Sequence, residues 1–180
     1  MTRAPVATGL HDLVRARVRD VPDFPEPGVL FRDITPLLAD GTAFSAVIGH
    51  LADAFGGEVD AIAGIEARGF LLAAPLAVVL GVGVIAVRKA GKLPPPTLHT
   101  AYDLEYGTAE IEVSPAGLRD GSRIVLVDDV LATGGTAGAA ARLLEQAGAR
   151  IVALAFLIEL AELGGRAALG DRSIHSLVTY

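Results

Sequence analysis

Two adjacent aspartates follow an apolar run in the second half of the chain. The stretch from Ile124 to Gly138 reads IVLVDDVLATGGTAG, and its first four residues have the character of a buried strand. Burying Asp128 and Asp129 is costly unless a ligand or a cation offsets their charge. Because successive side chains of a strand point to opposite faces, the two carboxylates can serve one ligand only if the strand has already ended. We therefore expect the chain to turn at these aspartates.

The residues that follow have the properties of a phosphate site. The segment from Ala132 to Thr136, ATGGT, offers two hydroxyls and backbone amides that no bulky side chain obstructs, at an expected helix start. The preceding carboxylates would suit ribose hydroxyls or a hydrated Mg²⁺, which proteins bind through one or two carboxylates plus substrate phosphate. The pattern predicts a sugar phosphate as ligand. Taken alone, an aspartate pair before Gly-Gly is also typical of a capped surface turn.

A basic segment provides a second candidate anion site. Residues 88–92 read RKAGK, three positive charges in five residues without a neighbouring acid in the sequence. A solvated loop is the simpler explanation, but in a chain of net charge -6 such a cluster favours a local anion site. The established phosphate motifs GxxxxGK[ST] and GxGxxG are both missing from the sequence.

Composition limits the class of protein. A chain of 180 residues is long enough for one domain with a substantial core, and 52% hydrophobic with 20% charged residues is typical of a globular protein. The net charge of -6 argues against a general nucleic-acid or anionic-membrane surface. Without cysteine there is neither a disulfide framework nor a thiolate metal site, which fits a cytoplasmic protein. The four histidines have no metal-ligand spacing.

One apolar stretch is long enough to raise the question of a membrane span. Residues 69–87 contain no charged side chain. Pro75, Gly81 and Gly83 interrupt the stretch, so we expect a helix of about three turns that Gly81 ends and a strand over residues 82–87. No signal peptide opens the chain, and we expect no membrane segment.

Apolar strands and helices alternate along the rest of the chain. We expect helices over residues 10–18, 44–55 and 136–148, strands over residues 60–65, 124–127 and 150–158, a hairpin over 102–113 around Gly107, and loop or extended chain over 21–35 and 88–96. Strands that are apolar throughout and separated by helices predict an α/β fold with a doubly wound, mostly parallel sheet flanked by helices. In such folds ligands bind beyond the carboxyl ends of the strands, where the aspartates lie.

These motifs together resemble a known family. The segment VLVDDVLATGGT is similar to the phosphoribosyl pyrophosphate motif of the type I phosphoribosyltransferases. Further segments resemble the adenine-specific branch of that family, in the same order along residues 20–160: DFPEPGVLFRDITPLL, ARGFLLAAPLA, VRKAGKLPPPT and YDLEYGTAEIEV. The aspartate motif is common to the whole superfamily, whereas the FPEPGVLFRDI and YDLEYG segments are what narrow the resemblance.

The resemblance implies a reaction and a set of residues. The family transfers a phosphoribosyl group from phosphoribosyl pyrophosphate to adenine, giving AMP and pyrophosphate, with Mg²⁺ held mainly through the substrate. At the matching positions, Asp128 and Asp129 hold the ribose hydroxyls, and the 5′-phosphate is bound by Ala132, Thr133, Gly134, Gly135 and Thr136. The pyrophosphate is contacted by Arg68, Lys89 and Lys92, and by Arg88, which acts across a subunit boundary in the implied homodimer.

Glu105 is the strongest candidate for acid–base chemistry. In the matching YDLEYG segment the glutamate exchanges a proton with the purine ring, and Tyr106 lines the substrate face. By spacing alone, Glu105 is more typical of an exposed carboxylate on a hairpin than of a catalytic residue. Arg68 joins it as a catalytic candidate, because charge separates as pyrophosphate leaves.

Adenine binding is assigned to Leu30, Phe31 and Arg32. A planar base is held between aliphatic or aromatic walls, and VLFRD after a proline-rich turn can present them. The alternative is that Leu30 and Phe31 are core residues and that Arg32 pairs with Asp33.

The family pattern implies one domain over residues 1–180. It has an N-terminal hood over residues 1–36, a lid and hairpin over 88–112, and the phosphoribosyl pyrophosphate motif over 124–138. Lid closure would keep water from the activated sugar. Two departures stand out: Leu72, Ala73 and Ala74 occupy positions near which many relatives have a glycine, and three consecutive prolines, 94–96, could stiffen the lid.

Two alternative functions stay open. A phosphoribosyltransferase for hypoxanthine, guanine or xanthine would share the phosphate motif but lack the FRDI and LEYG pairing. A non-catalytic regulator could sense phosphoribosyl pyrophosphate with the same fold. A DNA-binding regulator would need a basic helix-turn-helix region, for which the acidic chain leaves no room before residue 20.

Overall fold

The computed structural model describes residues 9–57, 59–103 and 108–180. The chain forms two compact units, residues 1–51 and 52–180. The smaller unit contains α1 (Leu10–Arg15), β1 (Arg19–Pro22), β2 (Leu30–Asp33) and α2 (Thr35–Ala39), and α3 (Gly41–Phe55) runs across the boundary.

Cross-strand ion pairs stabilise a hairpin in the smaller unit. Strands β1 and β2 are antiparallel, with Arg19 opposite Asp33 and Asp20 opposite Arg32. Arg19 binds Asp33 at 2.7 Å, and Arg32 binds Asp20. Opposite charges facing each other across two strands stabilise their register. The prediction of a helix up to residue 18 was therefore wrong at its end, because the chain leaves α1 at Arg15 to enter this hairpin.

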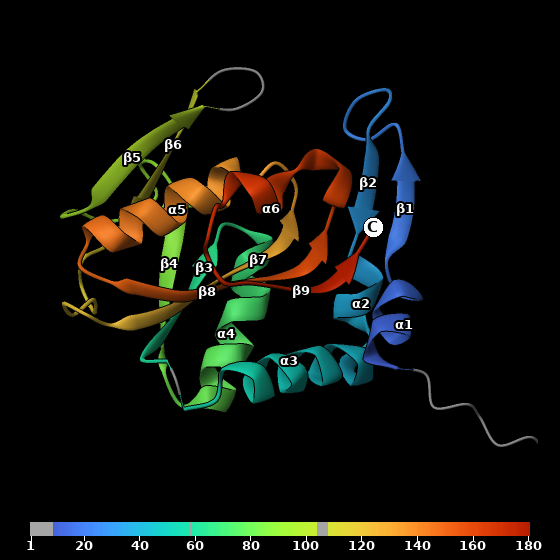
Figure 1. The fold of residues 1–180 in the computed structure, drawn as a ribbon, viewed down its shortest axis with the longest axis horizontal. Coiled ribbons are helices and arrows are strands. Elements are labelled where there is room, and N and C mark those ends of the chain that lie inside the picture. Colours follow the sequence, from blue (N-terminus) through green and yellow to red (C-terminus); the bar gives the residue numbers. More distant parts are fainter. Residues whose placement is uncertain (1–8, 58, 104–107) are drawn as a thin grey trace, which may run out of the picture. The chain divides into compact units, whose positions relative to one another are not determined.

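The larger unit is built on a seven-stranded sheet (Figure 1). Its strands are β3 (Ala61–Ile65), β4 (Gly83–Lys89), β5 (Leu98–Asp103), β6 (Thr108–Val113), β7 (Arg123–Leu131), β8 (Arg150–Glu159) and β9 (Ile174–Thr179). The spatial order is β5-β6-β4-β3-β7-β8-β9. Neighbours from β4 to β9 are parallel, whereas β6 is antiparallel to both β4 and β5. The predicted mostly parallel sheet is confirmed.

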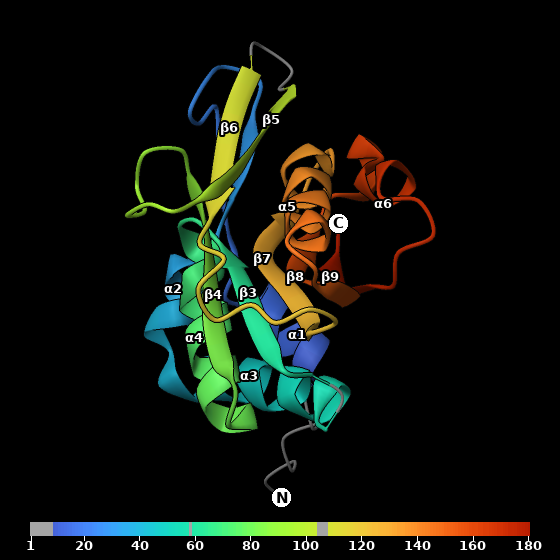
Figure 2. The same ribbon diagram turned by 90° about the vertical axis from the view of Figure 1, so that its left-hand side faces the viewer.

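Two helices cover opposite faces of this sheet (Figure 2). Helix α4 (Arg68–Leu80) packs so closely on β3 that a Cβ at Gly64 would lie 2.8 Å from Ala73 Cβ. Helix α5 (Gly135–Gln146) packs with Ala63 and Ile65, which point away from Gly64's face because side chains alternate along a strand. Short elements η1 (Ala161–Leu163) and α6 (Gly165–Ala168) connect β8 to β9.

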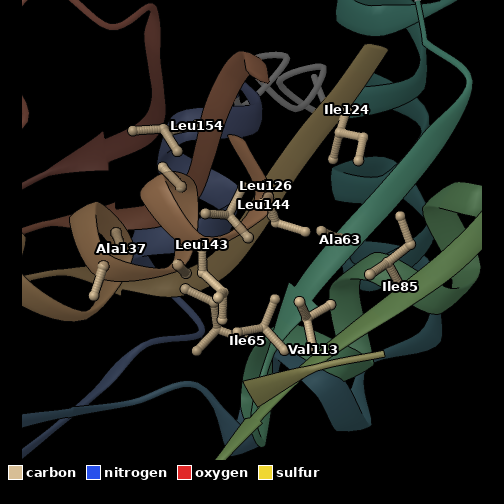
Figure 3. Close-up of a cluster of buried hydrophobic side chains, with 14 of the residues drawn as sticks. Ala63, Ile65, Ile85, Val113, Ile124, Leu126, Ala137, Leu143, Leu144 and Leu154 are labelled. Atoms are coloured by element: carbon tan, nitrogen blue, oxygen red, sulfur yellow. The ribbon is translucent and has the colours of Figure 1, made fainter. Parts of the chain in front are cut away.

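A cluster of buried hydrophobic side chains lies under α5 (Figure 3). Leu143 and Leu144 of α5 are directed toward sheet side chains such as Ile65 and Leu126. The first half of the helix is a run of buried small residues, Ala137, Gly138, Ala139, Ala140 and Ala141. Small side chains allow a close approach of helix and sheet, so the packing places the amino end of α5 beside the end of β7.

The long apolar stretch divides as the sequence predicts. Helix α4 ends at Gly81, whose φ of 69° is left-handed, and β4 begins at Gly83. No helix within the described residues has the length and apolar character that crossing a membrane requires.

Strands β4, β5 and β9 differ from the prediction. Strand β4 continues through Arg88 and Lys89, expected in a loop, because both residues pair with β6. Strand β5 begins at Leu98 rather than residue 102, again through pairing with β6. Strand β9 was not predicted at all; it pairs with the apolar strand β8, and of its own residues only Val178 is fully buried.

Leu126 tests the packing of the central strand. It is 1% exposed in β7, so Leu126→Ala should lower the free energy of unfolding by about 2–5 kcal/mol through lost burial and a cavity. Leu98→Ala is the matched control, because Leu98 is 39% exposed on the edge strand β5. Denaturant unfolding of both variants measures the difference, and equal losses would contradict a core centred on β7.

Candidate active site

A cavity lies at the carboxyl ends of the central parallel strands. Its volume is about 320 Å³. The described residues that line it come from the ends of β3, β4 and β7, the start of α4 and α5, and the β5–β6 pair: Ile65, Glu66, Ala67, Arg68, Val87, Arg88, Lys89, Tyr102, Ile111, Asp128, Asp129 and Thr136. This is the edge at which ligands bind in open parallel sheets.

Both aspartates lie within β7, so the expectation that the strand ends before them was wrong. Strand β7 runs to Leu131 and stays paired with β8, whereas its pairing with β3 stops at Val127. Beyond Val127 the side of β7 toward β3 carries no strand, which opens it to the cavity. Both carboxylates reach the cavity from a continuing strand, and the Asp129 amide donates to Asp128 Oδ1 at 2.9 Å.

Burial makes the two carboxylates electrostatically unfavourable in the unliganded protein. Burial raises the pKa of Asp128 well above its usual range, and the neighbouring Asp129 charge adds to the effect. Burial also raises the pKa of Asp129, against the opposing influence of Arg68. Arg68 Nε lies 2.8 Å from Asp129 Oδ2, a side chain only 5% exposed. Groups that donate hydrogen bonds to these carboxylates, as sugar hydroxyls do, therefore stabilise their ionised form.

Gly69 allows α4 to start directly against β7. A Cβ at this position would lie 2.7 Å from the Val127 carbonyl oxygen and 3.1 Å from Asp128 Oδ1. Only glycine permits this approach, which brings the first residue of α4, Arg68, within reach of Asp129.

The ATGGT segment forms a second, smaller hollow next to the cavity. Its volume is about 90 Å³, and it is lined by Asp128, Val130, Leu131, Ala132, Thr133, Gly134, Gly135, Thr136 and Ala137. Gly134 precedes α5 with a left-handed φ of 83°, and a Cβ there would lie 2.7 Å from the Gly165 carbonyl oxygen. The amides of the first turn of α5 face no intrahelical acceptor, so this hollow suits an anion. Thr136 lines both hollows.

The structure separates the basic residues into two groups. Arg68, Arg88 and Lys89 line the cavity, whereas Lys92 does not. Arg88 is bound to Glu66 at 3.3 Å, and the Lys89 amide donates to the same carboxylate at 3.0 Å. The hydrogen bond from Arg88 has the largest influence on the pKa of Glu66 and lowers it. Burial acts in the opposite direction, but the hydrogen bond from the Lys89 amide also lowers the pKa, and the net effect is a lowered value. The basic segment thus has an acidic neighbour that its own sequence does not reveal.

Tyr102 is a cavity residue that the sequence analysis missed. It lies on β5, and Thr136 Oγ1 donates to its hydroxyl at 3.2 Å. The Glu66–Ala67 segment was missed as well. Its position after an apolar strand and before Arg68 is the same signal that identified the aspartates, which follow the apolar run of residues 124–127.

The predicted adenine residues lie on the hairpin of the smaller unit. Leu30, Phe31 and Arg32 form most of β2. Leu30 is 46% exposed, so it is not a core residue, and Arg32 pairs with Asp20 instead of Asp33. The Phe31 ring meets Phe24 edge to face, with centroids 5.2 Å apart. This surface is apolar and aromatic, as a planar base requires.

Two predicted residues lie outside the described part of the chain. Glu105 and Tyr106 fall between residues 103 and 108, where the structure describes nothing. Within the described residues, no group of three or more metal-binding side chains comes together.

Comparison with known proteins agrees with the geometry of the site. The family described as "Phosphoribosyl transferase domain" matches residues 36–172. Adenine phosphoribosyltransferase of Clavibacter sepedonicus is 57% identical over 172 residues, 96% of this chain and 90% of that protein. The enzyme of the same name from Streptomyces coelicolor is 58% identical over 177 residues, covering 96% and 97%.

Solved structures show the same likeness. A crystal structure of adenine phosphoribosyltransferase from Thermoanaerobacter pseudethanolicus superposes with a TM-score of 0.89 at 48% identity, covering 93% of this chain and 98% of that one. The enzyme from Saccharomyces cerevisiae, complexed with adenine and an imino-altritol bisphosphate, superposes with a TM-score of 0.88 at 38% identity, covering 93% and 98%. The fold and the site thus define a type I phosphoribosyltransferase. Within that class, the chain belongs to the adenine phosphoribosyltransferase family.

The raised pKa of Asp128 leads to a stability prediction. Because the folded-state pKa lies above the unfolded value of about 3.9, the unliganded protein loses stability as the pH rises above the unfolded value, and the loss is complete once the pH exceeds the folded-state pKa. At neutral pH, Asp128→Asn should therefore raise the free energy of unfolding by about 1 kcal/mol or more, and the melting midpoint by roughly 2–4 °C.

Asp60→Asn is the control with the opposite sign. Hydrogen bonds from the Arg123 side chain and amide lower the Asp60 pKa to about 2, so its ionised form stabilises the folded state at neutral pH. Its stabilisation is lost as the pH falls through that value, and Asp60→Asn should lower the melting midpoint. Thermal unfolding without ligand at pH 7 measures both, and a destabilised Asp128→Asn would refute the electrostatic account.

Proposed function

We propose that this protein transfers the 5-phosphoribosyl group of phosphoribosyl pyrophosphate to adenine, forming AMP and pyrophosphate. The observation that carries the proposal is that Asp128, Asp129, Arg68 and Thr136 line one cavity. Hydroxyl-binding, cationic and phosphate-binding groups therefore face the same space. The related adenine phosphoribosyltransferase of Trypanosoma brucei, 25% identical, was solved in complex with AMP, pyrophosphate and ribose-5-phosphate.

Different parts of the substrate bind in the two hollows. In this proposal the hollow at Ala132, Thr133, Gly134, Gly135 and Thr136 takes the 5′-phosphate, because amides and the start of α5 favour an anion. The ribose hydroxyls donate to Asp128 and Asp129, which offsets the cost of burying two carboxylates. The pyrophosphate lies against Arg68 and Lys89 in the larger cavity. Lys92 is a further ligand of the pyrophosphate, and Arg88 contacts it from the partner subunit of a dimer.

Catalysis requires the stabilisation of separating charge. As the bond from the ribose C1′ to pyrophosphate breaks, positive charge develops on the ribose and negative charge on the leaving group. Arg68 is a catalytic candidate because it can stabilise the negative charge, while the buried carboxylates near the ribose can stabilise the positive charge. The Asp129 partner also holds the Arg68 guanidinium in the cavity before substrate arrives.

Adenine is assigned to Leu30, Phe31 and Arg32 of the smaller unit and to Tyr106. The support is the exposed apolar and aromatic surface of the β1–β2 hairpin. Glu105 exchanges a proton with the purine as it attacks the ribose, with the lid over residues 88–112 excluding water.

Mg²⁺ is the cofactor implied by this substrate. The cavity fits it, because two buried carboxylates with raised pKa values lie where a hydrated, phosphate-bound cation could share their charge. Bound mainly through phosphoribosyl pyrophosphate, the ion would neutralise charge on the leaving group.

A homodimer is part of the proposal. Helix α4 exposes Leu71, Val78 and Val79, at 50%, 80% and 60%, an apolar surface on which a second copy could pack. In such a dimer Arg88 acts across the subunit boundary.

Transfer to hypoxanthine or guanine and a purely regulatory role are the alternative functions. The lack of cysteine fits the proposed cytoplasmic location.

Product formation from competing purines tests the assignment together with Glu105. Wild-type protein with Mg²⁺ and phosphoribosyl pyrophosphate should form AMP from adenine and give no nucleotide from hypoxanthine or guanine. Glu105→Gln should reduce kcat about 10²–10⁴-fold, the usual contribution of general acid–base catalysis. Chromatography of the nucleotide products measures both effects.

Glu110→Gln is the matched control, because Glu110 is exposed on β6 close to Glu105 in the sequence. It should retain the wild-type rate. Binding of phosphoribosyl pyrophosphate without any product from the three purines would make the protein a sensor and refute the enzymatic proposal.

Removal of the metal provides a separate prediction. Excess EDTA should abolish AMP formation, and added Mg²⁺ should restore it, because the substrate's phosphates carry most of the metal's ligands. The melting midpoint of the protein without substrate should not change with EDTA. A metal-dependent midpoint would indicate instead a site made by the protein alone.

A further inference from the structure

Glu112 is a buried carboxylate outside the cavity. It lies on β6 and is 4% exposed, with Arg88 of β4 and His99 of β5 as its direct neighbours in the sheet register. A buried charge is destabilising unless several hydrogen bonds satisfy it. Glu112 therefore needs an explanation.

Its partners come from the loop that carries the basic segment. Glu112 Oε1 accepts from the Lys92 amide at 2.6 Å and from the Leu93 amide at 2.7 Å. The Gly91 amide and the Thr97 hydroxyl also donate to this carboxylate. Burial alone would raise its pKa, but these donors outweigh it and lower the pKa of Glu112. The carboxylate thus acts as a template around which residues 91–97 fold.

The same loop is held from its other side. Arg88 Nη1 donates to the Lys92 carbonyl oxygen at 3.0 Å, and the Arg88 guanidinium is itself bound to Glu66. The backbone of Lys92 is therefore fixed through both its amide and its carbonyl. The Lys92 side chain is exposed and lies outside the cavity lining. The anchored backbone fixes the point from which that side chain can reach a ligand.

We propose that Glu112 is a positioning residue that holds the backbone of Lys92 so that its ammonium group can bind the pyrophosphate of the substrate. The proposal rests on the proposed function, in which Lys92 is a pyrophosphate ligand. Glu112 itself touches no substrate. Its effect is confined to one substrate, because a preorganised lysine lowers the entropic cost of binding pyrophosphate and leaves adenine binding unaffected.

Steady-state kinetics of Glu112→Gln tests this role. Glutamine has nearly the same shape but loses the charge that strengthens the amide hydrogen bonds. The KM for phosphoribosyl pyrophosphate should rise about tenfold, while the KM for adenine stays within about twofold. Glu110→Gln, an exposed change on the same strand, should alter neither. An unchanged KM for phosphoribosyl pyrophosphate, even with a lowered melting midpoint, would overturn the proposal and leave Glu112 a purely structural residue.

A double-mutant cycle shows whether the effect passes through Lys92. If Glu112 acts by positioning Lys92, then Glu112→Gln in a Lys92→Ala background should change the KM for phosphoribosyl pyrophosphate by less than about twofold. Additive effects of the two changes would overturn the proposal. Should Glu112→Gln yield too little folded protein, Thr97→Val removes one hydrogen bond to the same carboxylate and should shift the same KM in the same direction, by about threefold.

Different results would refute the proposed function and the positioning role of Glu112. If the wild-type protein forms no AMP, the proposed function fails. If it forms AMP and the KM for phosphoribosyl pyrophosphate responds to Lys92→Ala but not to Glu112→Gln or Thr97→Val, only the positioning role of Glu112 fails.

Discussion

Asp128 and Asp129 place two neighbouring carboxylates within the strand β7, and burial raises the pKa of both. One cation, Arg68, faces them from the start of α4. The balance between these three groups explains much of the surrounding architecture. The two carboxylates are unfavourable without ligand, and a ligand that donates hydrogen bonds to them relieves this cost. The unliganded fold thus carries an electrostatic cost that contributes to the free energy of binding when a ligand removes it.

The strands and helices around this pair meet its requirements. Strand β7 outlasts its pairing with β3, which opens one side of the strand to the cavity. Gly69 lets α4 begin against that opening, and Gly134 lets α5 begin just beyond it. The carboxylates of Glu66 and Glu112 accept hydrogen bonds from backbone amides of the basic segment, residues 88–92. Acidic side chains therefore organise the site at several points, in addition to any role in binding substrate.

Local sequence patterns predicted the sheet class and the aspartate motif, because apolar runs and small residues act over short distances. They did not predict where β7 ends, since the strand continues to Leu131 through its pairing with β8 after its pairing with β3 has stopped. The pairing of Arg32 with Asp20 depends on hairpin register, and the pairing of Arg88 with Glu66 depends on two strands meeting at one edge. Such contacts between distant residues leave no periodic signal. The roles of Glu105 and Tyr106, and the N-terminal hood over residues 1–36, stay predictions.

The run of alanines in α5 limits how this protein can change over generations. Because Ala137, Ala139, Ala140 and Ala141 are buried against the sheet, the depth at which the helix lies follows from their volume. A single added methylene would lift the helix and, with it, the loop at its amino end. Selection for binding of the phosphate would therefore also act on residues that never touch it. Drift at these positions should be slow, although no chemistry takes place there.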